Sequence, residues 1–331
     1  MRISLGSVVF LSGLLGGLSC TRQYVRTTTD EIVQRTPARV ARGEYLVRGP
    51  LACGGCHTSR TTGSLSDDED SEMALGGGNM MEDRGLSVYV PNITSDDETG
   101  LGRWTDDQLM RALRDGIRPD GALLFPMMPF GSYRHLSDED TRAVVVYLRS
   151  LPKVRTSRAR QENKVPLYAK FAIYSLGVAH HSPVSNVRAP DRSDTVHYGQ
   201  YLMQIAQCAD CHALGKMFPV KPTDDGFLSG SAGPFEMPGY GKVWASNLTP
   251  DGETGLGMRS DAAIKQALRT GIRFDGKTMA PPMSIMRQHY AAMTDADLDA
   301  LISYLRTLKP VKKATPPRQL PAEAKARLGE T

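Results

Sequence analysis

Two short cysteine motifs constrain this chain more than any other feature. They are Cys53-Gly54-Gly55-Cys56-His57 and Cys208-Ala209-Asp210-Cys211-His212. C-x-x-C-H is typical of covalent attachment of a c-type haem, in which both thiols become thioethers and the histidine is the proximal iron ligand. A zinc half-site or a redox pair leaves the histidine after the second cysteine unexplained in both copies. The motifs therefore predict two covalently bound c haems, with His57 and His212 as iron ligands.

The rest of the chain repeats together with these motifs, which indicates a duplicated module. The segment 92–102, NITSDDETGLG, returns as 247–257, NLTPDGETGLG, with eight of eleven positions identical. The segment 112–121 returns as 267–276, and the segment 147–151 returns as 304–308. The copies are 155 residues apart from the cysteine motif to the second of these segments, and 157 residues apart at the last.

One methionine in each module stands where a distal iron ligand is needed. Met128 and Met283 each lie 71 residues after the histidine of their module and seven residues after an Asp-Gly pair. Both stand beside prolines, which stiffen a loop that must aim a ligand. Methionine is also a flexible core filler, but the nearby Met127, Met279 and Met286 have no counterpart in the other module. We predict Met128 and Met283 as distal ligands, because a thioether is the usual sixth ligand of electron-transfer cytochromes c.

Three further histidines could bind iron instead. His180 and His181 lie between the modules, and His289 follows the second methionine loop. A surface or structural role is the expectation for each of them.

The amino terminus has the features of an export signal. Met1-Arg2 precedes a stretch that carries no charge before Arg22 and is apolar as far as Leu18, which is short for a membrane span. We interpret residues 1–19 as a signal peptide. The sequence up to Cys20 resembles a bacterial lipoprotein signal, so Cys20 is the expected site of lipidation and of anchoring to a membrane. Plain secretion and an uncleaved anchor are the alternatives, and the polar residues 20–37 read as a tether.

The formal net charge of +4 is too small to indicate a nucleic-acid partner. Positive charge is concentrated in 152–195, with eight Lys and Arg against three Asp and Glu, and in 309–331, with six against two. Residues 67–72 are acidic. Such runs are mostly solvated surface, and docking of a partner is the less expected role.

The pattern along the chain predicts an all-α fold of two domains, because no long strand pattern appears. Thr105 and Gln108 form a capping box for a helix that Gly116 ends, and Ser137 begins a helix that extends to Leu151. Ser260 and Thr294 take the same cap positions in the second module. The expected domains are 38–152 and 196–311, joined by a linker at 153–195 and followed by a basic tail at 312–331.

These motifs, together with N-I/L-T-x-D-x-x-T-G-L-G and D-G-x(6)-M, resemble those of cytochrome c subunits of membrane-associated bacterial dehydrogenases. The resemblance covers roughly residues 40–310 and includes the linker piece 163–167. It implies two tandem class I cytochrome c domains, and a partner that oxidises alcohols, aldehydes or sugar acids. It also implies thioether roles for the cysteines, proximal roles for the histidines and distal roles for the methionines: Cys53, Cys56, Cys208, Cys211, His57, His212, Met128 and Met283. Those subunits often have three haem modules, whereas this chain has two.

We therefore expect an exported, periplasmic, membrane-anchored electron carrier that passes electrons from a partner dehydrogenase to a respiratory acceptor. A di-haem peroxidase is the main alternative, and it requires one iron with an open distal position, which a register-matched methionine in both modules disfavours. A haem-based sensor would need a signalling domain, which the sequence does not indicate. A catalytic dehydrogenase subunit would need a dinucleotide motif or a further metal cluster, which the sequence does not indicate either.

Overall fold

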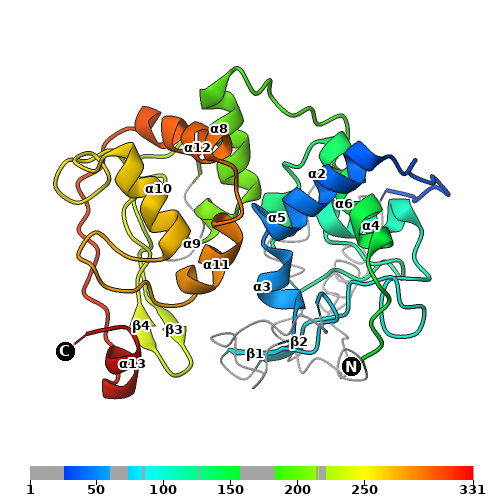
Figure 1. Ribbon diagram of the computed structural model, residues 1–331, viewed down its shortest axis with the longest axis horizontal. Helices are drawn as coiled ribbons and strands as arrows, with labels where there is room; N and C mark the ends of the chain where they lie inside the picture. Colours follow the sequence, from blue (N-terminus) through cyan, green and yellow to red (C-terminus); the bar gives the residue numbers. More distant parts are fainter. Residues whose placement is uncertain are drawn as a thin grey trace, which may run out of the picture.

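The computed structural model describes residues 26–59, 74–83, 86–125, 127–156, 183–213, 215 and 221–330. The expected signal peptide, Cys20, His180, His181 and most of the expected linker lie outside the described residues. The chain forms two similar lobes that lie side by side (Figure 1). Within the described ranges, no helix is both long enough and apolar enough to cross a bilayer.

Both lobes have the same order of elements. The first contains α2 (Pro37–Arg48), α3 (Cys53–His57), β1 (Met80–Asp83), β2 (Leu86–Tyr89), α4 (Asp106–Asp115), α5 (Phe130–Tyr133) and α6 (Asp138–Ser150). The second contains α8 (Thr195–Ile205), α9 (Cys208–His212), β3 (Phe235–Met237), β4 (Gly241–Val243), α10 (Asp261–Thr270), α11 (Met283–Tyr290) and α12 (Asp295–Thr307), and α13 (Ala322–Arg327) follows it. The fold is thus mostly helical and duplicated, as the sequence repeat predicts.

The expectation of an all-α fold missed two small antiparallel sheets. Strand β1 pairs with β2, and β3 pairs with β4, so each lobe has one hairpin at the same place in the chain. Strands of three or four residues are too short to show a period-2 alternation, which is why the pattern gave no signal.

The predicted helix starts are confirmed at the residue level. Thr105 and Gln108 form a reciprocal capping box at α4, and Gly116 ends that helix with φ 69°. Ser137, Ser260 and Thr294 each accept a hydrogen bond from a backbone N–H in the first turn of α6, α10 and α12. These side chains satisfy amide groups that have no partner inside the helix.

Each lobe contains one close crossing of two helices, and a glycine lies at each crossing. A Cβ placed on Gly43 of α2 would lie 2.0 Å from the carbonyl oxygen of Ala143 in α6. A Cβ placed on Gly199 of α8 would lie 1.9 Å from the carbonyl oxygen of Ala300 in α12. Glycine therefore lets the backbones approach more closely than any side chain would allow.

Residues 26–36, within the expected tether, lie against the first lobe. Arg26 forms an ion pair of 2.6 Å with Asp107, and the Thr29 amide donates to the same carboxylate at 2.7 Å. The Val33 side chain is buried among the apolar residues Leu109, Met110, Val145 and Val146. This stretch therefore covers one side of α4 and α6.

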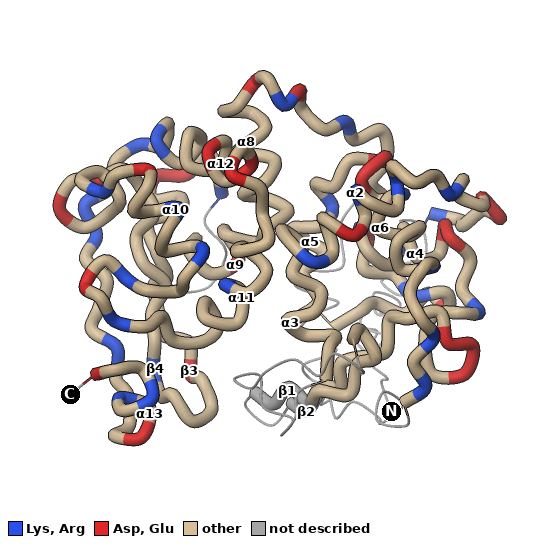
Figure 2. Tube along the Cα trace, viewed as in Figure 1, with Lys and Arg blue, Asp and Glu red and all other residues tan. Residues whose placement is uncertain are grey.

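The basic carboxyl-terminal segment lies against the second lobe. Gln319 exchanges backbone hydrogen bonds with Lys242 of β4, and Lys312 forms an ion pair of 2.6 Å with Glu253. Lys309 likewise pairs with Asp225 at 2.7 Å. Figure 2 shows positively and negatively charged residues interspersed along the chain in both lobes. Much of the positive charge that the sequence concentrates in this segment is thus matched by nearby carboxylates.

The two lobes meet through reciprocal hydrogen bonds, so their contact has approximate twofold symmetry. Tyr45 of the first lobe donates to Asp297 of the second, and Tyr201 of the second donates to Asp140 of the first, both at 2.6 Å. Corresponding residues are exchanged in these pairs, as in an isologous dimer interface.

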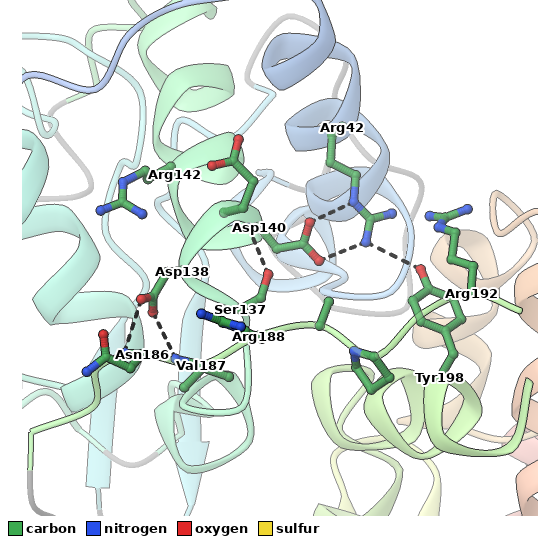
Figure 3. A pocket seen from close by; sticks show the side chains of 13 residues that line it. Arg42, Ser137, Asp138, Asp140, Arg142, Asn186, Val187, Arg188, Arg192 and Tyr198 are labelled. Carbon is green, nitrogen blue, oxygen red and sulfur yellow. Dashed lines mark hydrogen bonds and ion pairs between the residues drawn. The ribbon is translucent and has the colours of Figure 1, made fainter. Parts of the chain in front are cut away.

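Arg42 extends the contact between the lobes. Its guanidinium binds Asp140 through two bonds of 2.8 Å and reaches the Tyr198 hydroxyl at 3.4 Å (Figure 3). These residues line an open surface cavity where residues 186–192 pass from the first lobe towards the second.

Candidate haem-attachment sites

Each cysteine motif forms one helical turn that starts from an unusual backbone conformation. Ala52 before α3 has φ 51°, and Gln207 before α9 has φ 62°, which is the left-handed region that few residues other than glycine adopt. A buried tyrosine hydroxyl holds the preceding carbonyl in each lobe: Tyr133 donates to Leu51, and Tyr290 donates to Ala206. Such a strained position persists when the surrounding contacts fix it.

The turn places the two thiols of a motif on one face, because residues three apart in a helix are neighbours. Cys53 and Cys56 lie on α3, and Cys208 and Cys211 lie on α9. Within the described residues these four thiols are not joined in disulfides. Burial raises the pKa of the Cys53 thiol to about 12.

Both motif histidines are oriented by a backbone carbonyl. The His57 Nδ1 lies 2.8 Å from the Pro91 carbonyl oxygen, and the His212 Nδ1 lies 2.7 Å from that of Ser246. A carbonyl can only accept, so Nδ1 carries the hydrogen and Nε2 keeps its lone pair. Burial lowers the pKa of both imidazoles, partly opposed by this hydrogen bond, which favours the neutral form that binds metals. The pair is the arrangement expected for a proximal ligand and its supporting acceptor.

The repeated N-I/L-T motif explains how these carbonyls are positioned. In the first lobe the Asn92 side chain accepts from the amide and hydroxyl of Thr94, both at 2.8 Å, and donates to the Val154 carbonyl at 2.6 Å. Asn247, Thr249 and Val311 form the same set of bonds in the second lobe. Each asparagine directly follows the residue whose carbonyl receives the histidine. The motif therefore fixes the histidine's partner.

A glycine from a neighbouring loop donates a hydrogen bond to the backbone carbonyl of each motif histidine. The Gly77 amide donates to the His57 carbonyl, and the Gly230 amide donates to the His212 carbonyl, both at 2.7 Å. Gly77 has φ 71°, and a Cβ there would lie 2.4 Å from the Pro91 backbone carbon. The close approach of the two loops therefore requires glycine.

The two predicted distal methionines occupy corresponding places. Met128 lies in the turn before α5, and Met283 is the first residue of α11. Both are half-buried and pack against one apolar cluster that contains Cys53 and that Cys208 also contacts. The structure thus brings both methionines and a cysteine of each motif to one core.

His289 is buried in a helix, as expected for a histidine with a structural role. It is 5% exposed, lies on α11 and contacts the Arg48 carbonyl through Nδ1 at 3.0 Å. Its ring also lies against the first motif, because a Cβ on Gly55 would be 3.1 Å from its Nε2.

The second variable residue of each motif, Gly55 or Asp210, faces the opposite lobe. Asp210 of the second motif accepts a hydrogen bond of 2.8 Å from Ser132 of α5. In the corresponding place Gly55 faces His289 of α11. The small Ser132 therefore faces the larger Asp210, and the large His289 faces the small Gly55.

The donor set fits covalent haem. Each lobe offers two neighbouring thiols, an imidazole with Nε2 available and a thioether from the same core. Among the described residues there is no cluster of three or more Cys, His, Asp or Glu that could hold a bare metal ion.

Comparison with known proteins identifies the kind of domain that each lobe represents. Residues 196–309 match the family model "Cytochrome c", and residues 38–148 match the model "Cytochrome C oxidase, cbb3-type, subunit III". The chain carries cytochrome c domains. The relatives include the fructose dehydrogenase cytochrome subunit of Gluconobacter japonicus, which is 30% identical over 81% of this chain and 52% of its own length.

Two further relatives extend the comparison. The cytochrome c subunit of the quinone alcohol dehydrogenase of Gluconobacter oxydans is 29% identical over 83% of this chain and 55% of its own length. A diheme cytochrome c-type protein of Cereibacter sphaeroides is 23% identical over 94% of this chain and its full length. The chain thus spans little more than half the length of the two dehydrogenase subunits.

Sequence reasoning missed the groups that support the motif histidines and the turns before the motifs. The carbonyls of Pro91 and Ser246 carry no side-chain signal of their own. The tyrosines at 133 and 290 recur at the offset of the repeat, so a search of the repeat for matched polar residues could have found them.

Proposed function

We propose that this protein is a di-haem c-type cytochrome that carries electrons in the cell envelope from a partner dehydrogenase to a respiratory acceptor. The observation that carries the proposal is the duplicated site. In each lobe a C-x-x-C-H turn presents a histidine whose Nδ1 is bound to a backbone carbonyl. The names of the relatives support a role beside a dehydrogenase and favour a carrier over a peroxidase.

In this proposal the protein binds, orients and shields the haems. Cys53 and Cys56 would hold the first haem by thioether bonds, and Cys208 and Cys211 would hold the second. His57 and His212 would each supply a nitrogen ligand to iron, and Met128 and Met283 would each supply a sulfur ligand. The haem contributes reversible one-electron chemistry at its iron, whereas the chain sets the ligands, the burial and the hydrogen bonds.

The carbonyl partners have a defined part in this mechanism. Pro91 and Ser246 accept from Nδ1, so each imidazole keeps one tautomer and one ring orientation. This bond also increases the basicity of Nε2 towards a metal. A sulfur ligand from Met128 and from Met283 in addition to the imidazole would suit electron transfer and would disfavour the binding of peroxide.

The proposal is tested by counting covalent haems. After expression with a cytochrome c maturation system, mass spectrometry of the denatured chain should show two haem additions. The matched variants Cys53→Ala/Cys56→Ala and Cys208→Ala/Cys211→Ala should each retain one. A chain with fewer than two additions, or haem that is extracted by acidified acetone, contradicts the proposal, and vigorous peroxide turnover by the loaded protein would favour a peroxidase.

A further inference from the structure

The two haem-attachment turns are connected across the lobe contact by one side chain. Gln207, the residue before Cys208, donates from its side-chain amide to the Leu51 carbonyl at 3.0 Å. Leu51 is separated from Cys53 by Ala52 alone. Gln207 and Leu51 belong to different lobes and lie 156 residues apart in the chain.

A second contact strengthens the position of this side chain. The Gln207 amide also reaches the Tyr133 hydroxyl at 2.9 Å, and that hydroxyl donates to the same Leu51 carbonyl. Tyr133 and Leu51 are both buried, so water does not compete strongly for these bonds. The amide is therefore held in one place, at a junction of three polar groups.

The pseudo-twofold partner of this contact lacks the bridge. Ala52 occupies the place of Gln207 in the first lobe, and a methyl group cannot donate a hydrogen bond. In the second lobe Tyr290 donates to the Ala206 carbonyl at 2.6 Å, which reproduces the tyrosine bond within one lobe. The side-chain hydrogen bond of Gln207 is therefore present on only one side of the pseudo-twofold axis, from the second lobe to the first.

We propose that Gln207 is a positioning residue for electron exchange between the two haem sites. This inference rests on the proposed function. The route runs from Cys208 through Gln207, across one hydrogen bond to Leu51 and through Ala52 to Cys53. Electronic coupling falls less steeply through covalent bonds and hydrogen bonds than across a gap of the same length. One electron leaves a ferrous iron and reduces the ferric iron of the other module, while no bond breaks and no proton moves.

Asparagine at position 207 is the decisive variant. Asparagine tolerates the left-handed backbone that Gln207 adopts, so the turn before Cys208 is retained. Its side chain is one methylene shorter, so the amide cannot reach Leu51. Tyr45→Phe is the matched control, because it removes a hydrogen bond between the lobes, to Asp297, that touches neither cysteine motif.

The experiment follows one electron inside the fully loaded protein, since spatial contiguity alone does not establish coupling. A photoreduced flavin, used as an external one-electron donor, reduces one haem, and transient absorption records the redistribution to the other. We expect a severalfold slower redistribution in Gln207→Asn and an unchanged rate in Tyr45→Phe. The two midpoint potentials and the bimolecular rate of reduction by flavin should stay the same in Gln207→Asn, which a general loosening of the lobes would not allow.

The outcomes separate this inference from the proposed function. Equal redistribution rates in wild type and Gln207→Asn would overturn the bridge while leaving the di-haem carrier intact. An equal slowing in Tyr45→Phe, or a shift of both midpoint potentials in Gln207→Asn, would assign the effect to a loosened interface and also overturn the bridge. A wild-type protein that carries fewer than two covalent haems contradicts both proposals.

Discussion

At the scale of single residues, the two methionines carry a prediction that separates them from their neighbours. Met128→Ala should leave the first iron without its sulfur ligand, and Met283→Ala should do the same for the second. The midpoint potential of the affected haem should fall, because a thioether ligand raises it. The near-infrared absorption of the ferric protein, which reports the iron–sulfur bond, should lose about half its intensity in each variant, since each module supplies one of two such bonds.

Met127→Ala is the control, because Met127 is adjacent in the chain and its side chain is exposed. The near-infrared band should keep its full strength in this variant. A full band in Met128→Ala, or a diminished band in Met127→Ala, would show that the repeat assigns the wrong methionine.

At the scale of elements, the helix crossings set how each lobe closes on its haem-attachment turn. Gly43→Ala should lower the free energy of unfolding by about 1–3 kcal/mol, because the new methyl forces α2 away from the Ala143 carbonyl. The better helix propensity of alanine returns at most about 1 kcal/mol. Thermal unfolding should therefore show a lower melting temperature, and Gly199→Ala should have the same effect in the second lobe.

Gly131→Ala supplies the control for steric effects. Gly131 lies in the short helix α5, and a Cβ there meets no atom within 4 Å. Its melting temperature should stay the same or rise slightly. If Gly43→Ala or Gly199→Ala has the same melting temperature as Gly131→Ala, the two helices can move apart with little loss of stability, which contradicts the prediction.

At the scale of the whole molecule, one prediction concerns attachment to a membrane. We propose Cys20 as a lipidated amino terminus, since it is the one cysteine outside the two motifs. Serine cannot take the place of the lipidated cysteine, so Cys20→Ser should lose the several acyl chains that stable anchoring needs. Haem protein should then move from the membrane pellet into the soluble fraction. Haem absorbance in the two fractions measures this. If the variant still sediments with membranes, the apolar segment itself or a bound partner provides the anchor.

The sequence by itself determined the haem-attachment motifs, the duplication and most helix boundaries of this protein. These features depend on residues close together in the chain: C-x-x-C-H within one turn, and cap residues such as Thr105 and Ser137 within three positions of their partners. The repeat also predicted the two methionines, because Met128 and Met283 stand at the same position in the two modules.

Only the tertiary structure decided what supports the site. The carbonyl of Pro91 meets His57 across 34 residues, and Gln207 meets Leu51 across 156. Backbone carbonyls are the same in every residue, so their partners depend on how the loops approach one another and leave no mark in composition or periodicity. The contact between the lobes has the same origin, because Tyr45 and Asp297 become partners only when two folded modules pack together.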